Sequence, residues 1–142
     1  IQLPRPMIKH KNYDFSFSGL KTAVLYLVQK NKEKAKDESF IQELCHETQQ
    51  AIIDVLIDKT IRATKEYRAK TIILAGGVAA NKELRSQLEV QSSKLKVKFL
   101  VPDMKLCTDN GAMIAISGYF NQRKIKNGSW KTIKADANLR LS

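Results

Sequence analysis

The apolar residues in the first half of this chain recur at helical spacing. Between residues 19 and 30 they stand three or four positions apart, and Ser18 lies where a residue could cap such a helix. After a charged linker, the same spacing predicts one long helix over residues 37–68, about 45 Å from end to end. Most of its apolar side chains form one ridge, but Ile53 and Ile57 belong to a second. We therefore expect this helix to be covered on two sides.

The second half changes to short apolar runs that are typical of strands. Residues 71–75 are β-prone or small and apolar, and Gly76 and Gly77 end the run. Such a run predicts a strand buried on both faces, as in a parallel sheet. A helix is expected to begin near Asn81, which occupies an N-cap position, and to continue to about residue 91.

A second strand is predicted at residues 97–101, where apolar and polar side chains alternate. Asp109-Asn110-Gly111 then opens an apolar helix over 112–120, and an irregular tail is expected over 121–142. The strand–helix–strand order predicts a right-handed parallel βαβ unit in an α/β fold. Two strands make a thin sheet, so further strands are expected from a preceding segment.

The composition describes a globular chain with a strong positive charge. It is 43% hydrophobic and 27% charged, and it carries a net charge of +11 from 25 Lys and Arg against 14 Asp and Glu. No apolar run approaches the roughly 20 residues that span a bilayer, so no membrane association is expected. The lysines and arginines of the second half form two groups: Lys94, Lys96, Lys98 and Lys105, and Arg123, Lys124, Lys126, Lys131 and Lys134. Composition supports a polyanionic partner such as RNA and plain solubility charge about equally.

The start of the chain and its two cysteines narrow the class of protein further. The chain begins with Ile1 and has neither a basic nor an apolar leader, so we expect it to be a piece of a longer protein. Cys45 and Cys107 are far apart and form no C-x-x-C pair, which argues against a zinc ribbon or a disulfide scaffold and fits a reducing cytosol.

Two corners of the predicted βαβ unit carry candidate chemistry. The strand–Gly76-Gly77–helix corner that leads to Asn81 is a common docking place for a nucleotide. Its spacing fits neither G-x-G-x-x-G nor a P-loop, and a plain tight turn is the alternative. Asp109 could cap the helix after it, or face a ligand or metal across a cleft. Since parallel strands end at one edge of a sheet, both corners are expected at that edge.

The long helix offers weaker candidates. His46 lies on its flank, and Asp54 and Asp58 stand four residues apart like a carboxylate pair. Arg62 follows Asp58 by another four residues, so a solvated face of ion pairs is the favoured interpretation.

Three stretches together resemble one enzyme family. They are DFSFSGLKTAV at 14–24, LAGGVAANKELR at 74–85 and LCTDNGAMIA at 106–115. In this order and at this spacing they resemble the tRNA adenosine threonylcarbamoyltransferase family, formerly called glycoproteases, and LPRP at 3–6 fits too. With Thr108, the third stretch resembles the bacterial members of the family more than the archaeal ones. The resemblance covers nearly the whole chain and weakens after residue 120.

The resemblance implies a fold and an activity. The fold would be that of the actin-like ATPases (sugar kinases, heat-shock chaperones and actin), with residues 1–142 as part of the second lobe, a parallel βαβ core packed by long helices. The enzyme would transfer a threonylcarbamoyl group from threonylcarbamoyl-adenylate to the adenosine next to the anticodon of tRNAs that read codons starting with A. It would be cytoplasmic and would act with tRNA, a paralogous actin-like subunit and a small ATPase.

The resemblance also implies roles for four residues. Asn81 would contact the substrate adenylate, and Gly76 and Gly77 would form the backbone wall near its adenine and ribose. Asp109 would be a carboxylate ligand of one divalent metal, iron or zinc. No catalytic residue is assigned within the chain.

The metal ligands expected of the family are incomplete here. Its His-x-x-x-His pair is absent, and His10 and His46 do not have that spacing. The remaining ligands are therefore expected outside the chain, which by itself should be inactive.

The alternative function is that of a non-catalytic nucleotide- or RNA-binding lobe. A metalloprotease is disfavoured because no H-E-x-x-H is present. A sugar kinase would need a catalytic Asp from elsewhere.

Overall fold

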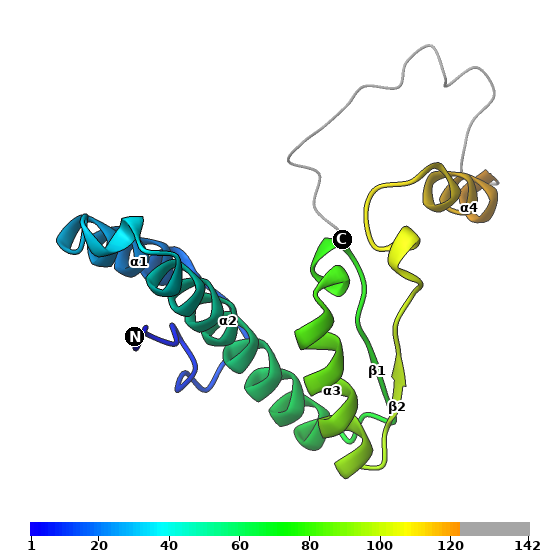
Figure 1. The fold of residues 1–142 in the computed structure, drawn as a ribbon. Coiled ribbons are helices and arrows are strands. Elements are labelled where there is room, and N and C mark those ends of the chain that lie inside the picture. Colours follow the sequence, from blue (N-terminus) through cyan, green and yellow to red (C-terminus); the bar gives the residue numbers. More distant parts are fainter. Residues whose placement is uncertain (123–142) are drawn as a thin grey trace.

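The computed structural model describes residues 1–122, in which a long helix carries a shorter helix at one end and a βαβ unit at the other (Figure 1). The helices are α1 (Ser18–Lys30), α2 (Glu38–Glu66), α3 (Lys82–Lys94) and α4 (Gly111–Asn121), and the strands are β1 (Thr71–Ile73) and β2 (Lys98–Leu100). Short 3-10 helices lie at η1 (Lys34–Lys36), η2 (Gly77–Ala80) and η3 (Met104–Leu106). The predicted order of helices and strands is confirmed. The predicted tail lies outside the described residues, apart from Asn121, which ends α4, and residue 122.

The two strands pair in parallel, as the βαβ order predicts. Ile72 lies opposite Phe99, and the strands are shorter than expected, three residues each. The prediction of a strand buried on both faces is wrong: Ile72 is buried, but Ile73 is 69% exposed. Successive side chains of a strand point to opposite faces, and Phe99 packs against α3 on the face that it shares with Ile72. The other face has no covering layer in the described part of the chain.

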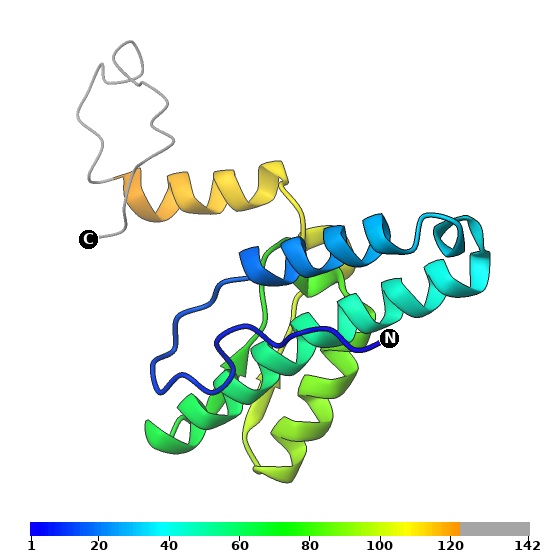
Figure 2. The ribbon, with the colours of Figure 1, turned by 90° about the vertical axis from the view of Figure 1, so that its left-hand side faces the viewer.

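Helix α2 is covered on two sides, as its two ridges predict. Toward its N-terminal half, Leu44 and Ala51 form a buried cluster with Leu3 of the N-terminal segment and Leu20 of α1. Toward its C-terminal half, Ile53 joins a second cluster with α3. Figures 1 and 2 show the same division, with α1 along one half of α2 and α3 beside the other.

The observed helix ends correct three expectations. The carboxylate of Asp37 accepts from the Ser39 N–H at 3.1 Å, so Asp37 caps α2 instead of beginning it. Ser18 is the first residue of α1 and not its cap; Phe17 occupies that position and provides no side-chain hydrogen bond. Helix α3 ends at Lys94, three residues later than predicted, and its last turns include the buried Ser92, whose hydroxyl donates to the Leu88 carbonyl at 2.7 Å.

Two cations of α2 hold the extended segment that leads into α1. Lys59 is only 1% exposed, and its ammonium donates to the carbonyls of Asn12 at 3.2 Å and Asp14 at 2.5 Å. Arg62 donates to the carbonyls of His10 at 2.8 Å and Asn12 at 2.9 Å. The prediction that Arg62 pairs with Asp58 is therefore wrong. Carbonyls two residues apart face the same side of an extended chain, which explains how one helix captures three of them.

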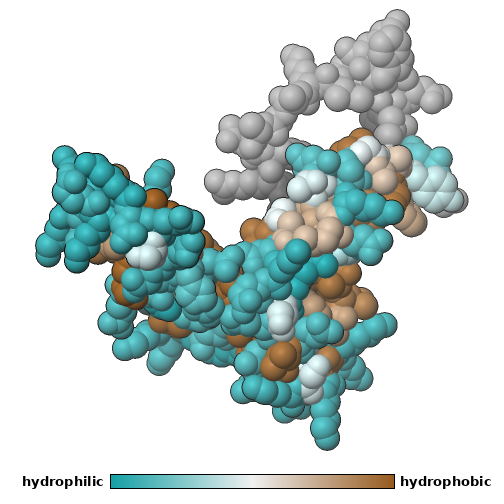
Figure 3. Space-filling view, viewed as in Figure 1, coloured by the Kyte–Doolittle hydropathy of each residue, from teal (hydrophilic) through white to brown (hydrophobic). Residues whose placement is uncertain are grey.

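Helix α4 is apolar but contains no buried residue. Ile114 is 74% exposed and Phe120 is 76% exposed. Figure 3 shows hydrophobic surface near α4 and the neighbouring end of the sheet. In the described part of the chain, no helix is both long and apolar enough to cross a bilayer.

Candidate functional site

The first corner of the βαβ unit is a glycine turn with open space around it. Gly76 has φ +79° and ψ −175°, a conformation that side chains disfavour. Gly77 begins η2, and a Cβ placed on either glycine would meet no atom within 4 Å. The turn therefore requires glycine at residue 76 for its backbone conformation, and it leaves bare backbone accessible to a ligand.

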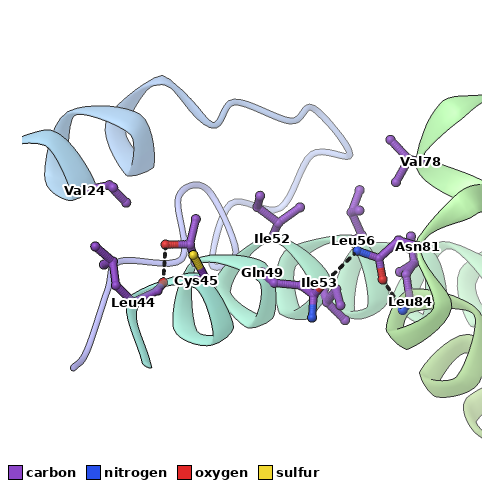
Figure 4. Close-up of a pocket in the computed structure, with 11 residues that line it drawn as sticks. Val24, Leu44, Cys45, Gln49, Ile52, Ile53, Leu56, Val78, Asn81 and Leu84 are labelled. Atoms are coloured by element: carbon purple, nitrogen blue, oxygen red, sulfur yellow. Dashed lines mark hydrogen bonds between the residues drawn. The ribbon is translucent and has the colours of Figure 1, made fainter. Parts of the chain in front are cut away.

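Asn81 caps α3, as its position in the sequence predicts. Its side-chain oxygen accepts from the Leu84 N–H at 3.0 Å, and its side-chain amide donates to Oε1 of Gln49 on α2 at 3.0 Å (Figure 4). Both ends of the Asn81 amide are thus engaged within the protein. The contact with Gln49 is one that sequence patterns did not indicate.

Asn81 and Gln49 line a cavity of about 440 Å³ between α1, α2 and the glycine corner. Figure 4 shows the lining side chains and labels all of them except Thr48: Val24, Leu44, Cys45, Thr48, Gln49, Ile52, Ile53, Leu56, Val78, Asn81 and Leu84. The Thr48 hydroxyl donates to the Leu44 carbonyl at 2.6 Å, so the two amides provide most of the polar character. An apolar cavity with a few converging polar groups is typical of a small-molecule site.

The second corner follows β2 at the same end of the sheet as the first, as expected (Figure 1). Asp109 does not cap α4. Asn110 does, with its side-chain oxygen accepting from the Met113 N–H at 3.1 Å and its amide donating to the Thr108 carbonyl at 2.8 Å. The extended backbone of Asn110 places it at the N-cap, one residue later than predicted. Asp109 is exposed, and its side chain makes no hydrogen bond to any described residue.

Asp109 could supply one metal ligand from this chain. Among residues 1–122, no group of three His, Cys, Asp or Glu side chains lies close enough together to hold an ion. His10 and His46 are both exposed. An exposed carboxylate with no internal partner fits a role as a single ligand and does not constitute a site on its own.

Arg85 links the two corners, and the sequence did not single it out. Its guanidinium donates to the Ala79 carbonyl of the first corner, to the Pro102 carbonyl at 2.8 Å and to the Cys107 sulfur at 2.9 Å. One feature of the sequence could have pointed to Arg85: it stands four residues after the N-cap Asn81, one helical turn along the same face.

The first basic group lies mostly away from these corners. Lys94 ends α3, and Lys98 begins β2, so both lie at the far end of the unit from Asn81, about 20 Å along the 13-residue helix. Lys105 lies in η3, near the second corner. The second basic group lies outside the described residues.

The weaker candidates on α2 form no catalytic pair. Asp54 is bound by Arg5, whose Nε and Nη2 both lie 2.8 Å from one carboxylate oxygen. His46 makes no hydrogen bond with the described part of the chain. The pKa of Glu47 is lowered, first by the hydrogen bond from Arg5 and then by the N–H of Leu3. These contacts attach the N-terminal segment to α2.

A parallel βαβ unit with a glycine corner, an Asn-capped helix and an adjoining apolar cavity is typical of the part of an α/β protein where ligands bind. The model of the tRNA N6-adenosine threonylcarbamoyltransferase family matches residues 1–116, and the chain therefore belongs to that family.

Curated relatives carry the same family description. The chain is 46% identical to the tRNA N6-adenosine threonylcarbamoyltransferase of Thermosipho africanus over 97% of its own length and 41% of the relative's. It is 44% identical to that of Desulfotalea psychrophila, over 91% of the chain and 38% of the relative. It is also 44% identical to the tRNA N6-adenosine threonylcarbamoyltransferase of Geobacillus kaustophilus, over 83% of the chain and 34% of the relative. The chain thus spans between 34% and 41% of the length of these three relatives.

Proposed function

We propose that the protein containing this chain transfers a threonylcarbamoyl group from threonylcarbamoyl-adenylate to the adenosine next to the anticodon of tRNAs that read codons starting with A. The observation that carries the proposal is the family match over residues 1–116, which includes both corners of the βαβ unit. The relatives named above are tRNA-modifying transferases by their descriptions.

Residues of the first corner contribute the adenylate-binding part of the proposed site. A nucleobase is planar and largely apolar with polar edges, which suits the cavity beside Asn81. Besides its bonds to Gln49 and Leu84, the Asn81 amide retains a second N–H and a second acceptor lone pair for such edges. Gly76 and Gly77 lie in open space, where ribose or phosphate can approach the backbone closely.

Asp109 contributes one ligand to a divalent metal, iron or zinc, in the proposed enzyme. Lewis-acid polarisation of a carbamoyl or phosphate oxygen is the chemistry that such a metal supplies when bound. The other ligands are proposed to come from outside the described residues, since residues 1–122 offer no group of three. The role of Asp109 itself is to present an exposed carboxylate at the second corner.

The chain forms part of the second lobe of an actin-like ATPase fold in this proposal. The uncovered face of the sheet at Ile73 and the exposed apolar surface of α4 support it, because both need further structure to bury them. The proposed enzyme acts in the cytoplasm on tRNA, together with a paralogous actin-like subunit and a small ATPase.

An assay of transfer tests the proposal. The complete protein is incubated with its partner subunits, threonylcarbamoyl-adenylate and unmodified tRNA, and the nucleosides are analysed by mass spectrometry. We expect threonylcarbamoyladenosine from the complete protein and none from the 142-residue chain. Failure of the complete protein to modify tRNA under conditions in which an established relative does so would contradict the proposal.

The alternative is a non-catalytic nucleotide- or RNA-binding lobe. Its supporting observation is a group of exposed lysines at the far end of the βαβ unit, Lys94, Lys96 and Lys98. RNA bound through lysines and phosphates is released by salt, so titrating tRNA at two salt concentrations separates such contacts from specific ones. Binding of tRNA or AMP by the complete protein without any transfer would favour this alternative.

A further inference from the structure

The segment after β2 has very little to hold it in place other than one cysteine. Cys107 is 2% exposed, and it is the only buried residue between positions 101 and 122. Its thiol lies 3.3 Å from the Asp103 carbonyl, a local contact, and its sulfur accepts from Arg85 of α3. Asp109 follows two residues later. The position of Asp109 therefore depends on how Cys107 is anchored.

Arg85 provides that anchor and connects it to the other corner. One guanidinium reaches the Ala79 carbonyl, two residues before Asn81, the Pro102 carbonyl, two residues after β2, and the Cys107 sulfur. A planar guanidinium has five N–H donors in a fixed arrangement, so it can hold three acceptors at defined relative positions. Lysine has a single ammonium on a flexible stem and cannot reproduce that geometry.

We propose that Arg85 is a positioning residue, which sets the place of the Asp109 carboxylate relative to Asn81 by fixing the Cys107 loop against the glycine corner. The inference rests on the proposed function, in which Asp109 binds a metal and Asn81 an adenylate. Arg85 itself contacts neither ligand.

The role makes a selective prediction. The hydrogen bonds of Asn81 to Leu84 and Gln49 do not involve Arg85, so adenylate binding survives its loss. Arg85→Met keeps the apolar stem and removes the guanidinium. In the complete protein it should weaken iron or zinc binding about tenfold, while AMP affinity changes less than about twofold. Arg85→Lys should recover part of the metal affinity, and Lys94→Met, at the exposed far end of α3, serves as the control.

Hydrogen exchange separates this inference from the proposed function. Backbone amides of residues 103–110 should exchange faster in Arg85→Met than in the control, whether or not a metal is present. If the wild-type protein binds neither metal nor AMP, the proposed function fails and the exchange data alone decide the role of Arg85. Unchanged exchange and metal affinity in Arg85→Met would overturn the inference, and so would an equal loss of metal and AMP binding in a folded variant.

Discussion

The side-chain amide of Asn81 donates to Oε1 of Gln49 at 3.0 Å, and this bond joins the first turn of α3 to the middle of α2 across the candidate cavity. The Asn81 amide nitrogen has a second N–H, but a ligand that uses the bonded N–H must displace Gln49 or share the donor with it. The free protein holds Asn81 in a fixed rotamer, and the exchange of one partner for another limits the affinity gained.

Gln49→Ala should strengthen AMP binding by the complete protein about twofold to fivefold, because the competing acceptor is gone. Isothermal titration calorimetry measures the change, and Gln42→Ala, on an exposed turn of the same helix, controls for the loss of a glutamine side chain. Weaker binding in Gln49→Ala would show that Gln49 contacts the ligand directly.

Asn81 has a capping role and a proposed binding role, and two substitutions separate them. Serine caps helices about as well as asparagine, so Asn81→Ser should keep stability and weaken AMP binding. Asn81→Ala should weaken AMP binding equally and also cost about 1 kcal/mol in the free energy of unfolding. Urea denaturation and calorimetry on both variants provide the comparison. Wild-type AMP affinity in Asn81→Ser would remove Asn81 from the adenylate site.

Lys59→Met should destabilise the protein by about 1–3 kcal/mol, because the carbonyls of Asn12 and Asp14 lose the donor that the buried Lys59 provides. Amides of the segment around Asp14 should also exchange faster. Lys65→Met is the matched control, since Lys65 is an exposed lysine on the same helix. Equal stability of the two variants would contradict the account of Lys59 as the residue that holds this segment.

Glu47 gives the attachment of the N-terminal segment a pH dependence. Its folded-state pKa is lowered from 4.5, chiefly by Arg5, so its contribution to stability is present above that value and is lost as the pH falls through the lowered pKa. The difference in unfolding free energy between wild type and Glu47→Gln should therefore shrink as the pH is lowered from about 6 to about 3. A difference that does not change over this range would contradict the ion pair.

The parallel βαβ unit could be predicted because local patterns determine it. Glycines after an apolar run, an N-capping Asn81 and a second alternating run leave few possible topologies. The burial of Ile73 could not be predicted in the same way. Its apolar character indicates a covered face, but the described part of the chain does not provide the cover.

The polar contacts of the site were the harder part to predict. Asn110 and Asp109 are both good capping residues, and only the backbone geometry shows that Asn110 takes the cap and leaves Asp109 exposed. The sequence singled out neither Arg85 nor Lys59. Their acceptors are backbone carbonyls far away along the chain, and the pattern of side chains gives no information about such acceptors.

The most direct test of the account is the metal content and tRNA modification of Asp109→Ala in the complete protein. Asp103→Ala is the control, because Asp103 is an exposed aspartate in the same loop. We expect Asp109→Ala to lose bound iron or zinc and to form no threonylcarbamoyladenosine, while Asp103→Ala keeps both. Full metal occupancy together with full modification in Asp109→Ala would contradict the assignment of this corner to the active site.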